Sequence, residues 1–187
     1  RLNSSAASDV YKRQVLILIP TRELAKQVLD VVHSLLGFKS SISSISLIGG
    51  ESMSKQLSQL KRKPRIFVGT PGRINDHLRR GSVNFKDVKY LILDETDRML
   101  DMGFEVQIKD ILKHIKGEKQ ILMFSATIPK NIIKLSSKYL NDPIRVSIGD
   151  SNIVAENITQ EIIELKSDEK LIEVVNQINK RNGSFFV

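Results

Sequence analysis

The chain has 187 residues, 41% of them hydrophobic and 27% charged, which is the composition of a globular protein large enough to bury a core. It has no cysteine and no apolar run near the roughly 18 residues that span a membrane, which excludes a disulfide framework and thiolate metal sites and predicts a cytoplasmic protein away from membranes. The net charge of +8 favours a polyanionic partner, and an aromatic content of 5% without tryptophan indicates contacts to a phosphate backbone rather than to stacked bases.

Residues 1–14 (RLNSSAASDVYKRQ) show neither helical nor strand periodicity, and the core pattern begins abruptly at Val15. The segment resembles the translated adaptor sequence that occurs in conceptual translations of sequencing reads. The alternative is a natural disordered tail. In either case we expect residues 1–14 to be a leader outside the fold.

From Val15 onward, short apolar runs alternate with amphipathic segments. Strands are predicted at 15–20, 45–50, 65–70, 90–94 and 121–125. The predicted helical faces are Val28, Val31, Val32 and Leu35 in a first helix that ends near Gly37, and Ile108, Ile111, Leu112 and Ile115 in a later one, with a polar helix through Lys61 between them. This alternation predicts an α/β fold with a doubly wound parallel sheet covered by helices.

The composition changes after residue 149. Residues 150–159 are polar and aperiodic, which predicts a linker. A strand at 160–165 and a helix with an apolar face at Leu171, Val174, Val175 and Ile178 are predicted beyond it. The chain is therefore expected to contain one domain over 15–149 and the start of a second over 160–187.

Polar clusters follow four of the predicted strands, at 20–22, 70–73, 94–97 and 125–127. Ligands of open parallel sheets bind at the carboxyl ends of the strands, so all four clusters are expected on one edge. Any one of them is what an ordinary surface loop would carry. The four together predict a functional site.

Two of these clusters have the composition of phosphate-binding helix starts. Thr21 and Thr70 are good N-caps, Gly72 allows close approach, and Arg22 and Arg73 add bidentate donors beside the free backbone N–H groups. The alternative is two well-capped helices with solvent-exposed arginines. Residues 49–50, both glycine, form either a plain turn or a close passage of the backbone.

Asp94 and Glu95 follow an apolar strand, as do the carboxylates that hold Mg²⁺ and the attacking water in phosphoryl-transfer enzymes. Adjacent carboxylates repel each other, which favours a cation between them. The alternative is a helix N-terminus whose acidic residues suit its dipole.

The cluster at 125–127 brings Ser125 and Thr127 to the next strand end, within reach of Asp97. The alternative is that Thr127 caps the helix near Pro129. The three histidines, His33, His77 and His114, lack metal-ligand spacing and are interpreted as structural or surface residues.

The segments PTRELAKQ (20–27), GG (49–50), TPGR (70–73), DETDRMLDMGF (94–104) and SAT (125–127), taken in this order, resemble the motifs of the first RecA-like domain of DEAD-box RNA helicases. The run RMLDMGF is similar to bacterial members. The resemblance implies a RecA-like fold of the P-loop NTPase type, with a second RecA-like domain beginning at residue 160. It also implies RNA-dependent ATP hydrolysis and local unwinding of RNA duplexes.

Site residues are implied by the same resemblance. The sequence-independent RNA-backbone contacts are Thr21, Arg22, Gly50, Thr70, Gly72 and Arg73. Asp94 and Glu95 are the catalytic residues that meet Mg-ATP, with Asp94 holding Mg²⁺ through water. Asp97, Ser125 and Thr127 couple hydrolysis to strand separation.

Two departures from the family pattern stand out. Thr96 occupies the position where the family has alanine, and this change is expected to alter packing more than chemistry. No G-x-x-x-x-G-K-[ST] phosphate loop is present, although the family has one upstream of the PTREL segment. The domain at 15–149 is therefore expected to be N-terminally truncated and inactive on ATP by itself.

A catalytically incomplete RNA-binding scaffold is the alternative to a helicase. A DNA translocase is a third hypothesis, which the residues of the PTREL, TPGR and SAT motifs disfavour. No partner among ribosome-assembly or RNA-decay proteins is indicated by the sequence.

Overall fold

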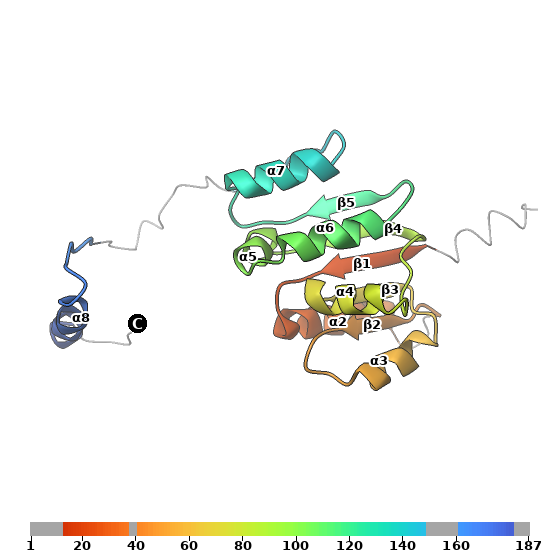
Figure 1. Cartoon of the computed structure of the whole chain (residues 1–187), viewed down its shortest axis with the longest axis horizontal. Coiled ribbons are helices and arrows are strands. Elements are labelled where there is room, and N and C mark those ends of the chain that lie inside the picture. Colours follow the sequence, from red (N-terminus) through yellow and green to blue (C-terminus); the bar gives the residue numbers. More distant parts are fainter. Residues whose placement is uncertain (1–12, 38–40, 149–160, 182–187) are drawn as a thin grey trace, which may run out of the picture. The chain divides into compact units, whose positions relative to one another are not determined.

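The computed structural model describes residues 13–37, 41–148 and 161–181. The chain divides into two compact units, Arg1–Arg145 and Val146–Val187. The elements of the first unit, labelled in Figure 1, are β1 (Gln14–Leu18), α2 (Arg22–Leu36), β2 (Ser44–Leu47), α3 (Met53–Leu60), β3 (Ile66–Gly69), α4 (Pro71–Arg79), β4 (Val88–Leu93), α5 (Thr96–Asp101), α6 (Glu105–His114), β5 (Gln120–Met123) and α7 (Lys130–Tyr139).

The five strands form one parallel sheet in the order β2-β3-β1-β4-β5. The central strand β1 pairs with β3 on one side and β4 on the other, and Leu18 lies opposite both Gly69 and Leu93. The chain runs from β1 out to β2, returns through β3, and then crosses to β4 and β5 (Figure 1). This arrangement confirms the predicted doubly wound parallel α/β fold.

The alternation of side chains along β1 divides the interior into two cores. Leu16 and Leu18 lie in the larger core with residues of α4 and α6, including Ile74 and Ile108. On the opposite face, Ile19 lies in a smaller core with Ala25 of α2, and Ile17 packs against it. Because successive strand residues point to opposite faces, a strand buried on both sides is apolar throughout.

The sheet begins one residue earlier than predicted. Gln14 pairs with Val88 of β4, and the Nε group of Arg65 donates a hydrogen bond to the carbonyl of Arg13 at 3.1 Å. Gln14 therefore belongs to β1 and not to a leader. Arg13 is described as the residue that precedes β1, and the remaining predicted leader residues, 1–12, lie outside the described residues.

The buried face of α2 differs from the prediction. Val31 and Leu35 are 58% and 81% exposed, so their assignment to the apolar face was wrong. Val28 packs against the smaller core as predicted, together with Leu24 and Ala25, which were not predicted. The helix carries more apolar residues than one face can bury, and the position of the sheet selects which stripe is covered.

The second unit contains the helix α8 (Lys170–Asn179), which confirms the predicted helix. The predicted strand at 160–165 is wrong for the described residues 161–165, which adopt no strand, and Ile162 is 91% exposed. A strand needs a neighbouring strand for its backbone hydrogen bonds, and the described part of this unit offers none. Across all described residues, no helix combines the length and apolarity that a membrane crossing requires.

Candidate functional site

The order of the strands sorts the predicted motifs into two adjacent groups. The loops that end β2, β3 and β1, at 49–50, 70–73 and 20–22, lie next to one another, and those that end β4 and β5 continue the same edge. Backbone hydrogen bonds join these strand ends: Ile19 N donates to Gly69 O at 3.0 Å, and Asp94 N donates to Leu18 O at 3.0 Å. The edge therefore has a basic, glycine-containing half beside a carboxylate and hydroxyl half.

Arg22 lies against the glycine pair at the end of β2. A Cβ atom on Gly50 would lie 2.4 Å from NH1 of Arg22, and one on Gly49 would lie 3.2 Å from NH2. Gly50 also has a φ of +78°, a conformation that disfavours any other residue. The two glycines thus make room for the guanidinium of Arg22.

The two threonines at the predicted helix starts behave differently. Thr21 caps α2, accepting a hydrogen bond from Leu24 N at 3.3 Å. Thr70 occupies the N-cap position of α4, with Pro71 following it, but its side chain makes no capping bond and is almost fully buried. A Cβ on Gly72 would meet nothing within 4 Å, so the first turn of α4 is open at this point.

Arg73 is held by the protein rather than extended into solvent. Its side chain is only 14% exposed, and NH1 donates to the carbonyl of Glu51 at 3.1 Å and to Oε1 of Gln56 at 3.0 Å. The alternative of a solvent-exposed arginine is therefore wrong at this position. Neither Glu51 nor Gln56 was predicted as a site residue. Nothing local in the polar sequence of α3 indicates that Gln56 is buried.

Gln56 and His77 form a buried polar pair behind Arg73. Both residues are 0% exposed, and Nε2 of His77 lies 2.8 Å from Oε1 of Gln56. Burial lowers the pKa of His77, and the positive charge of Arg73 lowers it further. His77 is thus a neutral structural residue, as interpreted from the sequence.

Asp94 and Glu95 stand at a sharp turn between β4 and α5. Glu95 has a left-handed backbone conformation, with φ 48° and ψ 51°, which is uncommon for a non-glycine residue and recurs at functional sites. Its N–H donates to Oδ1 of Asp94 at 3.0 Å, and its carboxylate pairs with Arg98 at 3.1 Å. A helix dipole requires no strained backbone, so this turn favours the interpretation of the pair as functional residues.

Thr96 fixes the carboxyl ends of β4 and β5 together. Its buried hydroxyl lies 3.2 Å from the carbonyl of Leu93 and 3.0 Å from that of Phe124, and its N–H also donates to Phe124 O. An alanine here would keep only the N–H contact. The geometry agrees with the expectation that this departure affects packing.

Asp97, Ser125 and Thr127 are brought into one hydrogen-bonded group. Oδ2 of Asp97 accepts from Oγ1 of Thr127 at 2.7 Å and from its N–H at 2.9 Å. Oγ of Ser125 accepts from Asp97 N at 3.3 Å and donates to Thr127 O at 2.7 Å. The alternative of Thr127 as a helix cap is wrong, because the N-cap of α7 is Pro129.

The hydrogen bonds in this group outweigh the effect of partial burial on Asp97. Burial raises the pKa of the carboxyl group, but the donors from Thr127 and from the backbone of Arg98 lower it to below the usual value. Asp97 is therefore ionised and acts as the acceptor that joins the ends of β4 and β5.

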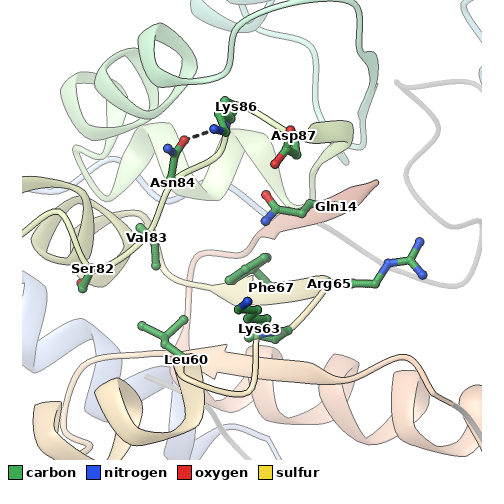
Figure 2. A pocket seen from close by; sticks show the side chains of 11 residues that line it. Gln14, Leu60, Lys63, Arg65, Phe67, Ser82, Val83, Asn84, Lys86 and Asp87 are labelled. Carbon is green, nitrogen blue, oxygen red and sulfur yellow. Dashed lines mark hydrogen bonds between the residues drawn. The ribbon is translucent and has the colours of Figure 1, made fainter. Parts of the chain in front are cut away.

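A cavity of about 360 Å³ lies among Gln14, Arg65, Asp87 and their neighbours (Figure 2). These residues precede or begin β1, β3 and β4, so the cavity is at the amino ends of the strands, opposite the motifs. Within the described ranges, no group of three or more histidine or acidic side chains is arranged to hold a metal ion.

The sequence matches known proteins over most of its length. A family model described as DEAD/DEAH box helicase matches residues 2–135. The chain is 43% identical over 179 residues to the ATP-dependent RNA helicase DBP2 of Saccharomyces cerevisiae, covering 92% of this chain and 33% of that protein. It is 40% identical over 162 residues to the ATP-dependent RNA helicase DbpA of Bacillus subtilis, covering 87% of this chain and 34% of that protein.

A solved structure gives the same result for the fold. The crystal structure of a DEAD box protein from the hyperthermophile Methanococcus jannaschii is 40% identical to the chain, with a TM-score of 0.69 over 90% of this chain and 44% of that one. The chain spans about a third of the length of the two curated relatives, DBP2 and DbpA. These matches come from a eukaryote, a bacterium and an archaeon, so the similarity of the RMLDMGF run to bacterial members stays a prediction.

Proposed function

Because the chain belongs to the DEAD/DEAH box helicase family, we propose that it forms the RNA-binding and catalytic edge of an ATP-dependent RNA helicase. The observation that carries this proposal is the shared edge of the sheet. Three neighbouring strands end in the arginine- or glycine-containing loops at 20–22, 49–50 and 70–73, and the next two end in the carboxylate and hydroxyl motifs. Binding of a phosphate backbone and hydrolysis of a triphosphate therefore occupy adjacent parts of one surface.

The basic half of the edge is proposed to bind successive phosphates of one RNA strand. Arg22 and Arg73 would supply the cationic donors, while Gly50, Gly72 and the helix start at Thr70 would let the strand approach the backbone. Thr21 is engaged in capping α2 and would contribute chiefly by fixing the loop. Such contacts carry no base information, so binding is expected to be independent of RNA sequence.

The carboxylate half fits a hydrated Mg²⁺ that accompanies ATP. Oδ1 of Asp94 is taken by the N–H of Glu95, whereas Oδ2 accepts no hydrogen bond from the described residues and is left for a metal-bound water. One carboxylate is enough, because Mg²⁺ in phosphoryl-transfer sites relies on substrate phosphates for other ligands. The ion would neutralise charge on the phosphates when bound.

Glu95 is proposed to orient and deprotonate the attacking water. Its left-handed turn places the carboxylate at the start of α5, directly after the residue proposed to face the metal. Arg98 holds that carboxylate in an exposed pair, which is weak enough to be exchanged for another partner. Asp97, Ser125 and Thr127 would couple hydrolysis to strand separation, because they join the end of β5 to α5.

The RNA-binding half of the proposal is tested by Arg22→Ala and Arg73→Ala, with Arg79→Ala as the control on the exposed side of α4. Each test substitution should weaken binding of single-stranded RNA equally for different sequences and reduce the salt dependence by about one phosphate contact. The control should leave the slope unchanged. An unchanged slope in both test variants would disprove the phosphate contacts.

A catalytically incomplete RNA-binding scaffold is the second candidate function. RNA-stimulated phosphate release from the full-length protein separates the two functions. The chain by itself is expected to release none, because loop amides and a lysine are needed to hold the triphosphate.

A cytoplasmic location, proposed from the absence of cysteine, is tested by imaging a tagged protein.

A further inference from the structure

Gln56 of α3 is a buried polar side chain that lies outside all the RNA-binding motifs. It is 0% exposed and comes between the glycine pair at 49–50 and the loop at 70–73 in the sequence. A buried amide is costly unless its donors and acceptors are paired. Its hydrogen-bond partners therefore indicate what the residue does.

The amide group of Gln56 can point in only one direction. Nε2 donates to the carbonyl of Ile48 at 3.0 Å and to Oε2 of Glu51 at 3.4 Å. Both partners are acceptors, so the nitrogen must face them and Oε1 must face the other way. The end of β2, immediately before the glycine pair, thereby fixes the orientation of the amide.

Oε1 of Gln56 faces α4 and accepts two hydrogen bonds there. NH1 of Arg73 donates to it at 3.0 Å, and Nε2 of His77 lies at 2.8 Å. Since Oε1 can only accept, neutral His77 carries its proton on Nε2, and its Nδ1 faces Oγ of Ser82 at 2.8 Å. His77 thus fixes the position of the same oxygen that holds Arg73.

The guanidinium of Arg73 is consequently fixed on one side. NH1 is used by Gln56 and by the carbonyl of Glu51, and Nε faces Asp76 at 3.8 Å. NH2 makes no hydrogen bond within the described residues and is the nitrogen left for a phosphate. An arginine already held in one rotamer loses less entropy when its ligand binds.

Resting on the proposed RNA contact of Arg73, we propose that Gln56 is a positioning residue for RNA binding. Its amide connects the end of β2 to α4, so that the glycine pair and Arg73 are presented to the strand in a constant relative arrangement. Gln56 itself touches no RNA. It acts through Arg73, and His77 supports it from behind.

The test is a double-mutant cycle on the purified chain, read by fluorescence anisotropy with a single-stranded RNA. Gln56→Met keeps the length and packing of the side chain but removes the acceptor, and Gln59→Met on the exposed side of α3 is its control. Gln56→Met should weaken RNA binding about three- to tenfold, as expected for loss of one coupled contact. In an Arg73→Ala background it should have no further effect.

The outcomes separate this inference from the function on which it rests. If Arg73→Ala leaves RNA affinity unchanged, the proposed contact of Arg73 is wrong. If Arg73→Ala weakens binding but Gln56→Met has no effect, or has the same effect in both backgrounds, Gln56 has no positioning role.

A measurement on the unsubstituted chain covers the case in which Gln56→Met fails to fold. In ¹⁵N relaxation of the arginine side chains, Nε–H of Arg73 should be as rigid as the backbone of α4, whereas that of the exposed Arg79 should be mobile. An Arg73 side chain as mobile as Arg79 would overturn the proposal.

Discussion

Thr127 donates two hydrogen bonds to a single carboxylate oxygen of Asp97, from its hydroxyl at 2.7 Å and from its N–H at 2.9 Å. In the chain, the rest of α5, the helix α6 and the strand β5 lie between the two residues, which belong to different motifs. Their contact joins the turn after β4 to the turn after β5. The two motifs are therefore in direct contact through these hydrogen bonds.

Thr127→Val should raise the pKa of Asp97 toward its ordinary value of 3.8, because the hydroxyl donor is lost while the shape of the side chain is kept. The lowered pKa gives stability that is present above the unfolded value and is lost as the pH falls through the folded value. The variant should therefore lose less stability on acidification below pH 4. A carboxyl ¹³C titration measures the shift, with Asp110, whose pKa is lowered by Lys113, as an internal reference. No movement of Asp97 would contradict the assignment of Thr127 as its principal donor.

Gly50→Ala should weaken RNA binding by displacing Arg22. The new Cβ would lie 2.4 Å from NH1 of Arg22, and the left-handed φ would add a strain of about 1 kcal/mol. Gly81→Ala is the matched control, since Gly81 has a φ of +65° but open space around it, and it should lose similar stability without loss of RNA affinity. In an Arg22→Ala background, Gly50→Ala should have little further effect on binding. Equal RNA affinities for the two glycine variants would argue against the displacement.

Glu95→Gln in the full-length protein should remove ATP turnover while nucleotide binding remains. The amide keeps the shape of the side chain but cannot accept the proton of the attacking water. Steady-state phosphate release and nucleotide affinity are the two measurements, and Glu105→Gln on α6 serves as the control for loss of an acidic side chain. Turnover within a few-fold of the parent would exclude Glu95 as the base.

The stability of the first unit should decrease as the pH falls from 7 to 5. The pKa of His77 is lowered from 6.5 chiefly by burial and then by the charge of Arg73, while Asp76 raises it and Arg80 has the smallest, lowering effect. A depressed histidine pKa means that the unfolded chain binds the proton first, so stability is full above 6.5 and is lost as the pH falls through the folded value. Urea unfolding of the parent and of His77→Gln at several pH values measures this, and the variant should show a smaller loss. Parallel curves for the two proteins would contradict a buried neutral His77.

Local sequence features were enough to identify the strands of the sheet and the polar clusters at its edge. The continuous apolar run of β1 and the Thr-Pro start of α4 depend only on neighbouring residues, so both could be predicted. The position of Asp94 and Glu95 after an apolar strand could also be predicted, because it does not depend on which strands lie beside that strand in the sheet.

Contacts between distant residues had to be decided by the tertiary structure. The sequence predicts five strands but not the order β2-β3-β1-β4-β5, because hydrogen bonding between strands is nonlocal, and it is this order that groups the basic loops. Val31 was predicted to be buried and is exposed, because the sheet covers another stripe of α2. Residues 161–165 have the apolar content of a strand, but the described part of their unit contains no neighbouring strand with which to pair.

Two hydrogen-bonded contacts of the candidate site also join residues that are distant in the sequence. Gln56 and Arg73 are 17 residues apart, and Asp97 and Thr127 are 30 apart. Each pair meets only because parallel strands bring their carboxyl ends to one edge of the sheet. The sequence by itself determined which polar and charged groups lie at the strand ends of this protein, and the packing of its strands determined which of those groups contact one another.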